Sequence, residues 1–125
     1  MRNVFWKLSR MFRSIGIEDI DYKTLIKISS ENKTVIIDVR TKDEYYNRHI
    51  PGAINIPLQD IGTRIEREVK NKNEIIIVYC EHGGRSRKAC YKIQKLGYTN
   101  IYNLKNGIAG VWNKLLLLYI IIFLN

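Results

Sequence analysis

The residues best suited to chemistry lie in one short segment, Cys80–Ser86, with the sequence Cys-Glu-His-Gly-Gly-Arg-Ser. Two adjacent glycines, Gly83 and Gly84, let the backbone amides turn inward, and the segment leads into a predicted helix. Inward amides and a helix N-terminus together bind anions. The helix dipole and Arg85 are both expected to lower the pKa of the Cys80 thiol. We therefore interpret Cys80 as a nucleophile in an anion-binding loop.

The elements around this segment alternate between helical and strand periodicity. Helices are predicted over residues 22–30 (capped by Asp21), 41–48, 58–72, 86–96 and 106–114. Strands are predicted over residues 34–39, within 49–57, over 74–79 and over 100–104. This alternation predicts an α/β fold, with a mostly parallel five-stranded central sheet and helices on both faces. Cys80 directly follows the most apolar strand, and folds of this class bind ligands beyond the carboxyl ends of their strands.

Two motifs resemble a known family. The first is IDVRTKDEYYNRHIPGAINIP at residues 37–57, and the second is VYCEHGGRS at residues 78–86. Together, in this order and at this separation, they are similar to the single-domain rhodaneses of the rhodanese-like sulfurtransferase superfamily. The resemblance covers about residues 15–112.

The resemblance implies a ping-pong transfer of sulfur with Cys80 as the catalytic nucleophile. Cys80 takes a sulfane sulfur from thiosulfate or a persulfide donor and passes it to cyanide, to a thiol or to a sulfur-carrier protein. Asp38 and Arg40 are implied to hold the surroundings of the site, and no metal or organic cofactor is implied. Arg85 is expected to bind the departing sulfite, within a substrate-binding loop made of Glu81, His82, Gly83, Gly84, Arg85 and Ser86.

Two other functions are open to this fold. Phosphatases and arsenate reductases of resembling families use a Cys-x5-Arg loop, but the position after five intervening residues is Ser86, and Arg85 comes one position too early. Rhodanese-like domains also serve as non-catalytic binding modules, although those usually lack the cysteine. Loading of one sulfur atom on Cys80 discriminates the enzyme from the binding module.

The remaining polar residues near these motifs are interpreted as structural. Glu44 is expected in the first turn of a helix or paired with Arg48, and His49 is expected to be hydrogen-bonded in a turn. Cys90 falls on the apolar side of the helix over 86–96 and is expected to pack in the core. Cys80, His82 and Cys90 lack a fourth ligand, so no metal site is predicted.

The formal net charge of +9 is unevenly distributed, at +4 over residues 1–17, −2 over 18–81 and +7 over 82–125. This distribution argues against a nucleic-acid partner. The last share is predicted to guide small sulfur anions to Cys80 and to make kcat/KM for thiosulfate salt-sensitive. It includes five cations of the loop and the following helix: Arg85, Arg87, Lys88, Lys92 and Lys95.

The 125-residue chain is divided into three predicted segments. Residues 1–16 form a basic amphipathic helix, residues 17–114 the rhodanese-like domain, and residues 115–125 an apolar tail too short to span a bilayer. The tail is expected to pack on the domain, with membrane or oligomer contact and poor order as alternatives. Two cysteines make no disulfide framework, so a cytoplasmic location is predicted, with peripheral membrane contact through either terminal segment left open.

Overall fold

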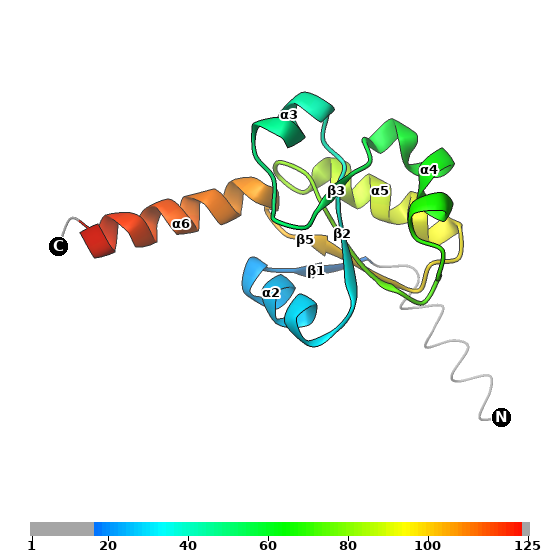
Figure 1. Ribbon diagram of the computed structural model, residues 1–125, viewed down its shortest axis with the longest axis horizontal. Coiled ribbons are helices and arrows are strands. Elements are labelled where there is room, and N and C mark those ends of the chain that lie inside the picture. The colour runs from blue at the N-terminus through cyan, green and yellow to red at the C-terminus, as the bar shows by residue number, and fades with distance from the viewer. Residues whose placement is uncertain (1–16, 124–125) are drawn as a thin grey trace.

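The computed structural model describes the backbone of residues 17–123 and the side chains of residues 17–113 and 121–123 (Figure 1). The predicted helix over residues 1–16 lies outside the described residues. The described elements are β1 (Glu18–Ile20), α2 (Tyr22–Glu31), β2 (Thr34–Asp38), α3 (Lys42–Asn47), β3 (Ile54–Asn55), the 3-10 turn η1 (Leu58–Asp60), α4 (Ile61–Glu68), β4 (Ile75–Tyr79), α5 (Gly84–Lys95), β5 (Asn100–Leu104) and α6 (Gly107–Phe123).

The five strands form one parallel sheet in the order β1-β5-β4-β2-β3. The predicted fold class is therefore confirmed. Strand β1 was not among the strands assigned from the sequence, because Glu-Asp-Ile is a short, acidic segment with only Ile20 buried. It becomes a strand by pairing with β5, which aligns Glu18 with Tyr102.

Helices cover both faces of the sheet (Figure 1). On one face, α4 and α5 pack Ile65 and Ile93 onto β4, and on the other, α2 and the start of α6 pack Leu25 and Ile108 onto the sheet. The central strand β4 is buried on both sides, as its continuous Ile-Ile-Ile-Val run predicts. Two apolar layers thus hold the carboxyl end of β4, where Cys80 follows.

Local signals determine most helix ends. Asp21 caps α2 by accepting a hydrogen bond from the Thr24 amide at 2.8 Å, and Thr41 forms a capping box with Glu44 at the start of α3. Helix α5 begins at Gly84, two residues before its predicted start, because Gly83 has a left-handed φ of 105° and serves as its N-cap. The helix N-terminus therefore lies inside the Cys80–Ser86 loop.

Two predicted helix lengths are wrong. The helix predicted over 58–72 is a 3-10 turn followed by α4, which ends at Glu68 because Val69 adopts an extended backbone and is buried. The helix predicted over 106–114 continues to Phe123 and extends away from the sheet (Figure 1). At its described end, Ile121, Ile122 and Phe123 are more than half exposed, in contrast to the burial expected for a tail packed on the domain. In the described part of the chain, no helix is long and apolar enough to cross a membrane.

Candidate active site

Cys80 lies at the carboxyl end of β4, and its thiol is held by the loop that follows. The amides of Gly83 and Ser86 donate to Cys80 Sγ at 3.1 and 3.4 Å, and Ser86 Oγ lies 3.4 Å from the same sulfur. Cys80 is only 1% exposed, and this burial raises the pKa of its thiol. Hydrogen bonds from Ser86, Gly83 and the His82 amide lower it by more, so the pKa lies below its usual value.

Cys90 provides an internal comparison because it is also fully buried. Its sulfur lies in the apolar layer under α5, and its thiol donates a long hydrogen bond to the carbonyl oxygen of Tyr102 at 3.8 Å. Burial raises the pKa of Cys90 to about 12. Cys90 thus packs in the core, as predicted, and the opposite shift at Cys80 is due to the loop.

The outer side of the loop is fastened by the start of α6. The amides of Ile108 and Ala109 donate to the carbonyl oxygens of Cys80 and Glu81 at 2.9 and 3.0 Å. Because α6 binds these carbonyl oxygens on the outer side of the loop, the amides of His82 and Gly83 can face the sulfur on its inner side. Gly107 makes this contact feasible, because a Cβ there would lie 2.3 Å from the Glu81 oxygen. Gly107 lies outside the two sequence motifs, although an Asn-Gly pair after a strand, here Asn106-Gly107, is a signal for left-handed backbone.

Arg85 is paired with a carboxylate from α3. Its guanidinium donates to both carboxylate oxygens of Glu44, at 2.8 and 3.0 Å. These hydrogen bonds lower the pKa of Glu44 to about 2 and raise the pKa of Arg85. Glu44 lies in the first turn of α3 as predicted, but the suggested pairing with Arg48 is wrong because Arg85 reaches it from α5.

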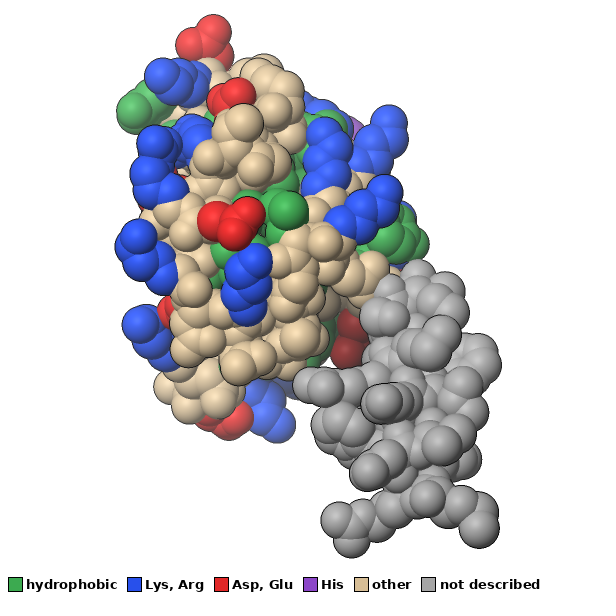
Figure 2. Space-filling model, turned by 90° about the vertical axis from the view of Figure 1, so that its right-hand side faces the viewer, with side chains coloured by type: hydrophobic (Ala, Val, Ile, Leu, Met, Phe, Trp, Pro, Cys, Tyr) green, Lys and Arg blue, Asp and Glu red, His purple; other side chains and the backbone are tan. Residues whose placement is uncertain are grey.

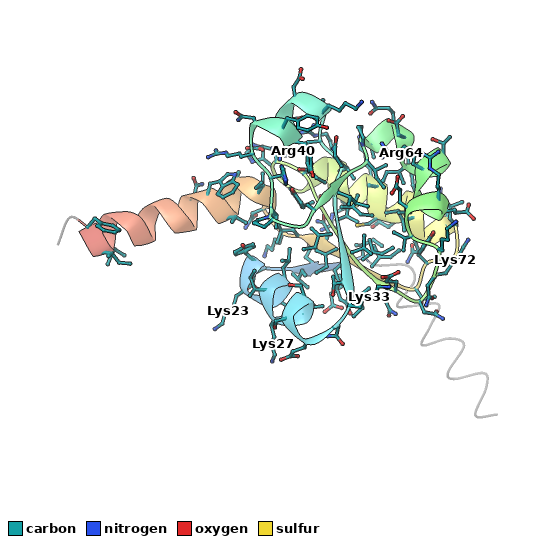
Figure 3. All side chains as sticks on the ribbon, in the orientation of Figure 1. Lys23, Lys27, Lys33, Arg40, Arg64 and Lys72 are labelled. Carbon is teal, nitrogen blue, oxygen red and sulfur yellow. The ribbon has the colours of Figure 1, made fainter. Side chains whose placement is uncertain are left out.

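Asp38 and Arg40 form the buried support beside the loop. Arg40 Nη2 lies 2.8 Å from the Asp38 carboxylate, and both side chains are almost fully buried. Arg40 also donates to the Arg48 carbonyl oxygen at 2.7 Å and to Glu81 at 3.2 Å. Figure 3 shows Arg40 beside the carboxyl ends of the strands. Asp38 and Arg40 thereby join β2 and the segment after α3 to the first residue of the loop.

The other predicted loop residues have distinct positions. Glu81 is partly buried against Arg40, so its carboxylate is directed to an ion pair. Within the loop, His82 and Gly84 are exposed, whereas Gly83 and Ser86 are buried. His49, as predicted, is bonded in a turn, with its Nδ1 2.8 Å from the Tyr45 carbonyl oxygen.

The cations near Cys80 are largely neutralised. Arg40 and Arg85 are opposed by three carboxylates, Asp38, Glu44 and Glu81, and Arg87 is paired with Asp19. Other basic side chains, such as Lys33 and Lys72, lie at the opposite end of the sheet from Arg40 (Figure 3). On the face shown in Figure 2, Lys and Arg side chains are spread over the surface and its rim, with Asp and Glu side chains between them. The N–H donors directed at the sulfur are thus backbone amides at the start of α5, while Arg85 and Arg87 are paired with carboxylates.

The described residues also bear on metal binding, which in proteins relies on clustered His, Cys, Asp or Glu side chains. Among the described residues, no group of three or more His, Cys, Asp or Glu side chains could hold one. The arrangement is suited instead to a sulfur nucleophile whose negative charge is bound by peptide N–H groups.

Comparisons with known proteins agree with this geometry. Residues 21–114 match the rhodanese-like domain family. Thiosulfate sulfurtransferase PspE of Escherichia coli is 42% identical over 67 residues, which are 54% of this chain and 64% of that protein, slightly less than two thirds of its length. A sulfurtransferase of Allochromatium vinosum is 29% identical over 95 residues, which are 75% of this chain and 87% of that protein.

A solved structure described as rhodanese with anions from E. coli has a TM-score of 0.57 and 37% identity. The match covers 61% of this chain and 88% of that chain. Because the family match extends over most of the sequence, and because the fold and both motifs agree with it, this chain belongs to the rhodanese-like domain family, whose members similar to it include sulfurtransferases.

Proposed function

We propose that this protein transfers a sulfane sulfur from thiosulfate or a persulfide donor to a thiophilic acceptor through a persulfide on Cys80. In the first step, the Cys80 thiolate attacks the outer sulfur of thiosulfate and forms a new S–S bond. The bond between the sulfane sulfur and the sulfonate breaks, and sulfite leaves with its electron pair. In the second step, cyanide or a thiolate attacks the outer sulfur, and Cys80 leaves as the thiolate.

The observation that carries this proposal is the set of N–H donors directed at Cys80 Sγ from Gly83 and Ser86. The reacting sulfur is anionic before attack, and the outer sulfur of the persulfide is anionic after it. Fixed backbone donors stabilise both anions without rearrangement. Glycine at position 83, with its left-handed φ, is what lets the chain turn its amide toward the sulfur.

Arg85 is expected to bind departing sulfite in this mechanism. Its two contacts with Glu44 use two of the five N–H donors of the guanidinium. Sulfite bound by Arg85 would therefore use the remaining donors or replace Glu44. The loop amides are already directed at the sulfur, and a related structure is described as rhodanese with anions from E. coli, which supports anion binding by this family.

Mass spectrometry of the intact protein after thiosulfate treatment tests the proposal. We expect the mass to increase by one sulfur atom, and we expect cyanide to reverse the increase. Cys80→Ser should abolish the increase, whereas Cys90→Ala, a change at an equally buried cysteine outside the loop, should retain it. If neither thiosulfate nor a persulfide donor loads Cys80, the enzymatic proposal fails and a binding module becomes the better interpretation.

The acceptor class can be tested in the same way. Protein already carrying the persulfide is mixed with cyanide, a small thiol or a sulfur-carrier protein with an accessible thiol, and loss of the added sulfur is followed in time. The acceptor that removes it fastest identifies the class. Because Cys80 is almost fully buried, we expect small acceptors to react without the large surface contact that a carrier protein needs.

A further inference from the structure

Ser86 is the first link of a hydrogen-bond chain that runs from Cys80 through Asn103 to Asp19 on β1. Its Oγ lies 3.4 Å from Cys80 Sγ, donates to the Gly83 carbonyl oxygen at 3.0 Å and is in close contact with Asn103 Oδ1. The Asn103 amide nitrogen in turn donates to the Asp19 carboxylate at 2.9 Å. Ser86 and Asn103 are 0% and 2% exposed, so water does not replace these partners freely.

Asp19 determines which way the Asn103 amide faces. Burial raises the pKa of Asp19, but hydrogen bonds from Asn103 and Arg87 lower it by more, so this side chain is a carboxylate that only accepts hydrogen bonds. The amide nitrogen of Asn103 must therefore face Asp19, and its oxygen must face Ser86. Arg87 holds the Asp19 carboxylate in place from α5.

The single proton of the Ser86 hydroxyl then has competing acceptors. When Cys80 is a thiol, each donor has an acceptor, because the thiol donates to Ser86 Oγ and the hydroxyl donates to the Gly83 carbonyl oxygen or to Asn103 Oδ1. When Cys80 is a thiolate, the sulfur competes with these two oxygens for the hydroxyl proton. A persulfide has no charge on its inner sulfur, so it does not make this demand.

We propose that Asn103 and Asp19 are positioning residues: Asn103, oriented by Asp19, competes with Cys80 for the Ser86 hydroxyl proton and so sets the reactivity of the Cys80 thiol. This proposal rests on the proposed function only in assigning Cys80 as the reacting group. Neither Asn103 nor Asp19 contacts the sulfur, and both act through Ser86. Removing Asn103 leaves the Gly83 carbonyl oxygen as the remaining competitor, so the hydroxyl donates more to the thiolate and the thiolate becomes easier to form.

The test is the pH dependence of Cys80 alkylation by iodoacetamide, followed on the Cys80 peptide by mass spectrometry. Asn103→Leu keeps the branched shape and the number of heavy atoms of the side chain but removes the acceptor, so the pH midpoint should fall by about one unit, the size expected for one hydrogen bond to a thiolate. Asn100→Leu is the matched control. It makes the same change on the same strand, at an amide that donates to the Asn73 carbonyl oxygen and has no link to Ser86.

A second pair of variants keeps the test valid if Asn103→Leu does not fold. Asp19→Ala removes the carboxylate that orients the amide, and it should lower the midpoint. Glu18→Ala removes an equal charge from the neighbouring exposed residue of β1 and should shift the midpoint less. The variants leave unchanged the charged groups Asp38, Arg40, Glu44, Glu81, Arg85 and Lys105 around the site. Asp19→Ala also removes the partner of Arg87, whereas Asn103→Leu leaves that ion pair in place.

Two results overturn the proposal: an unchanged or raised midpoint in Asn103→Leu, or equal shifts in Asp19→Ala and Glu18→Ala, which would indicate a charge effect alone. In a Ser86→Ala background, Asn103→Leu should produce no further shift, and a full shift there would also contradict it. Alkylation requires no sulfur donor. Failure of Cys80 to load sulfur would therefore remove the proposed function without changing these midpoints, and the two failures are distinguishable.

Discussion

Replacing Gly107 by alanine should damage both the stability of the domain and the loop around Cys80. Gly107 has a left-handed φ of 61°, which costs an alanine about 1 kcal/mol. Its added Cβ would lie 2.3 Å from the Glu81 carbonyl oxygen and 2.5 Å from that of Cys80. Both are backbone atoms, so the overlap cannot be relieved by rotating a side chain.

The backbone must therefore separate at this point. Separation breaks the hydrogen bonds from the Ile108 and Ala109 amides to the same two carbonyls, at about 1 kcal/mol each. We expect Gly107→Ala to lower the free energy of unfolding by about 3 kcal/mol, a large fraction of the total for a single domain. With an m-value of about 2 kcal/mol per M, the urea midpoint should fall by about 1.5 M.

The assay is urea unfolding followed by circular dichroism, with the alkylation rate of Cys80 measured on the folded protein. Gly62→Ala is the matched control, because Gly62 lies inside α4 with open space at its Cβ position. That change should be neutral or stabilising by up to about 1 kcal/mol. If Gly107→Ala is within about 0.5 kcal/mol of the unchanged protein and alkylates at the same rate, α6 does not fasten the loop as described.

Three further predictions concern the charged residues. Glu44→Gln should release Arg85 and raise kcat/KM for thiosulfate several-fold at low salt, with a steeper salt dependence than the unchanged protein, as measured by steady-state kinetics. Because the folded-state pKa of Glu44 is about 2, below its usual value of 4.5, its ion pair stabilises the fold above pH 4.5 and is lost as pH falls through 2. The stability difference between Glu44→Gln and the unchanged protein should therefore shrink over this range in acid-unfolding experiments. Arg40→Leu leaves Asp38 buried and unpaired and should cost about 3–5 kcal/mol in urea unfolding, whereas Arg64→Leu breaks a half-exposed helical pair worth less than about 1 kcal/mol.

The parts of the fold that depend on local sequence could be predicted. Asp21 and Thr41 cap helices with their own side chains, and the apolar residues before Cys80 form the central strand. The end of α4 depends instead on tertiary packing, because Val69 leaves the helix and is buried in the core. Strand β1 likewise depends on its partner, since its own side chains contain little strand signal.

The candidate site was predictable in its identity but not in its electrostatics. Cys80 and the glycines of the loop are contiguous, so their spacing indicates an anion-binding turn. The partner of Arg85 lies 41 positions earlier in the chain, and only the parallel order of β2 and β4 brings Glu44 next to it. Ser86 likewise meets Asn103, 17 positions later, and Asn103 meets Asp19, 84 positions before it, only through the order of the strands.

The nature of the donors explains why net charge is a poor guide to this site. A cationic side chain near a binding loop attracts carboxylates as well as substrate, and here Arg85 and Arg40 are already paired with acidic partners. The amides of Gly83 and Ser86 cannot be neutralised in this way, because the loop directs them at one enclosed sulfur atom. Their field is short-ranged and weakly screened by salt. Under the proposed function, such a loop selects an anionic sulfur by where it places N–H groups, whereas the lysines and arginines elsewhere on the surface act on it only from a longer distance.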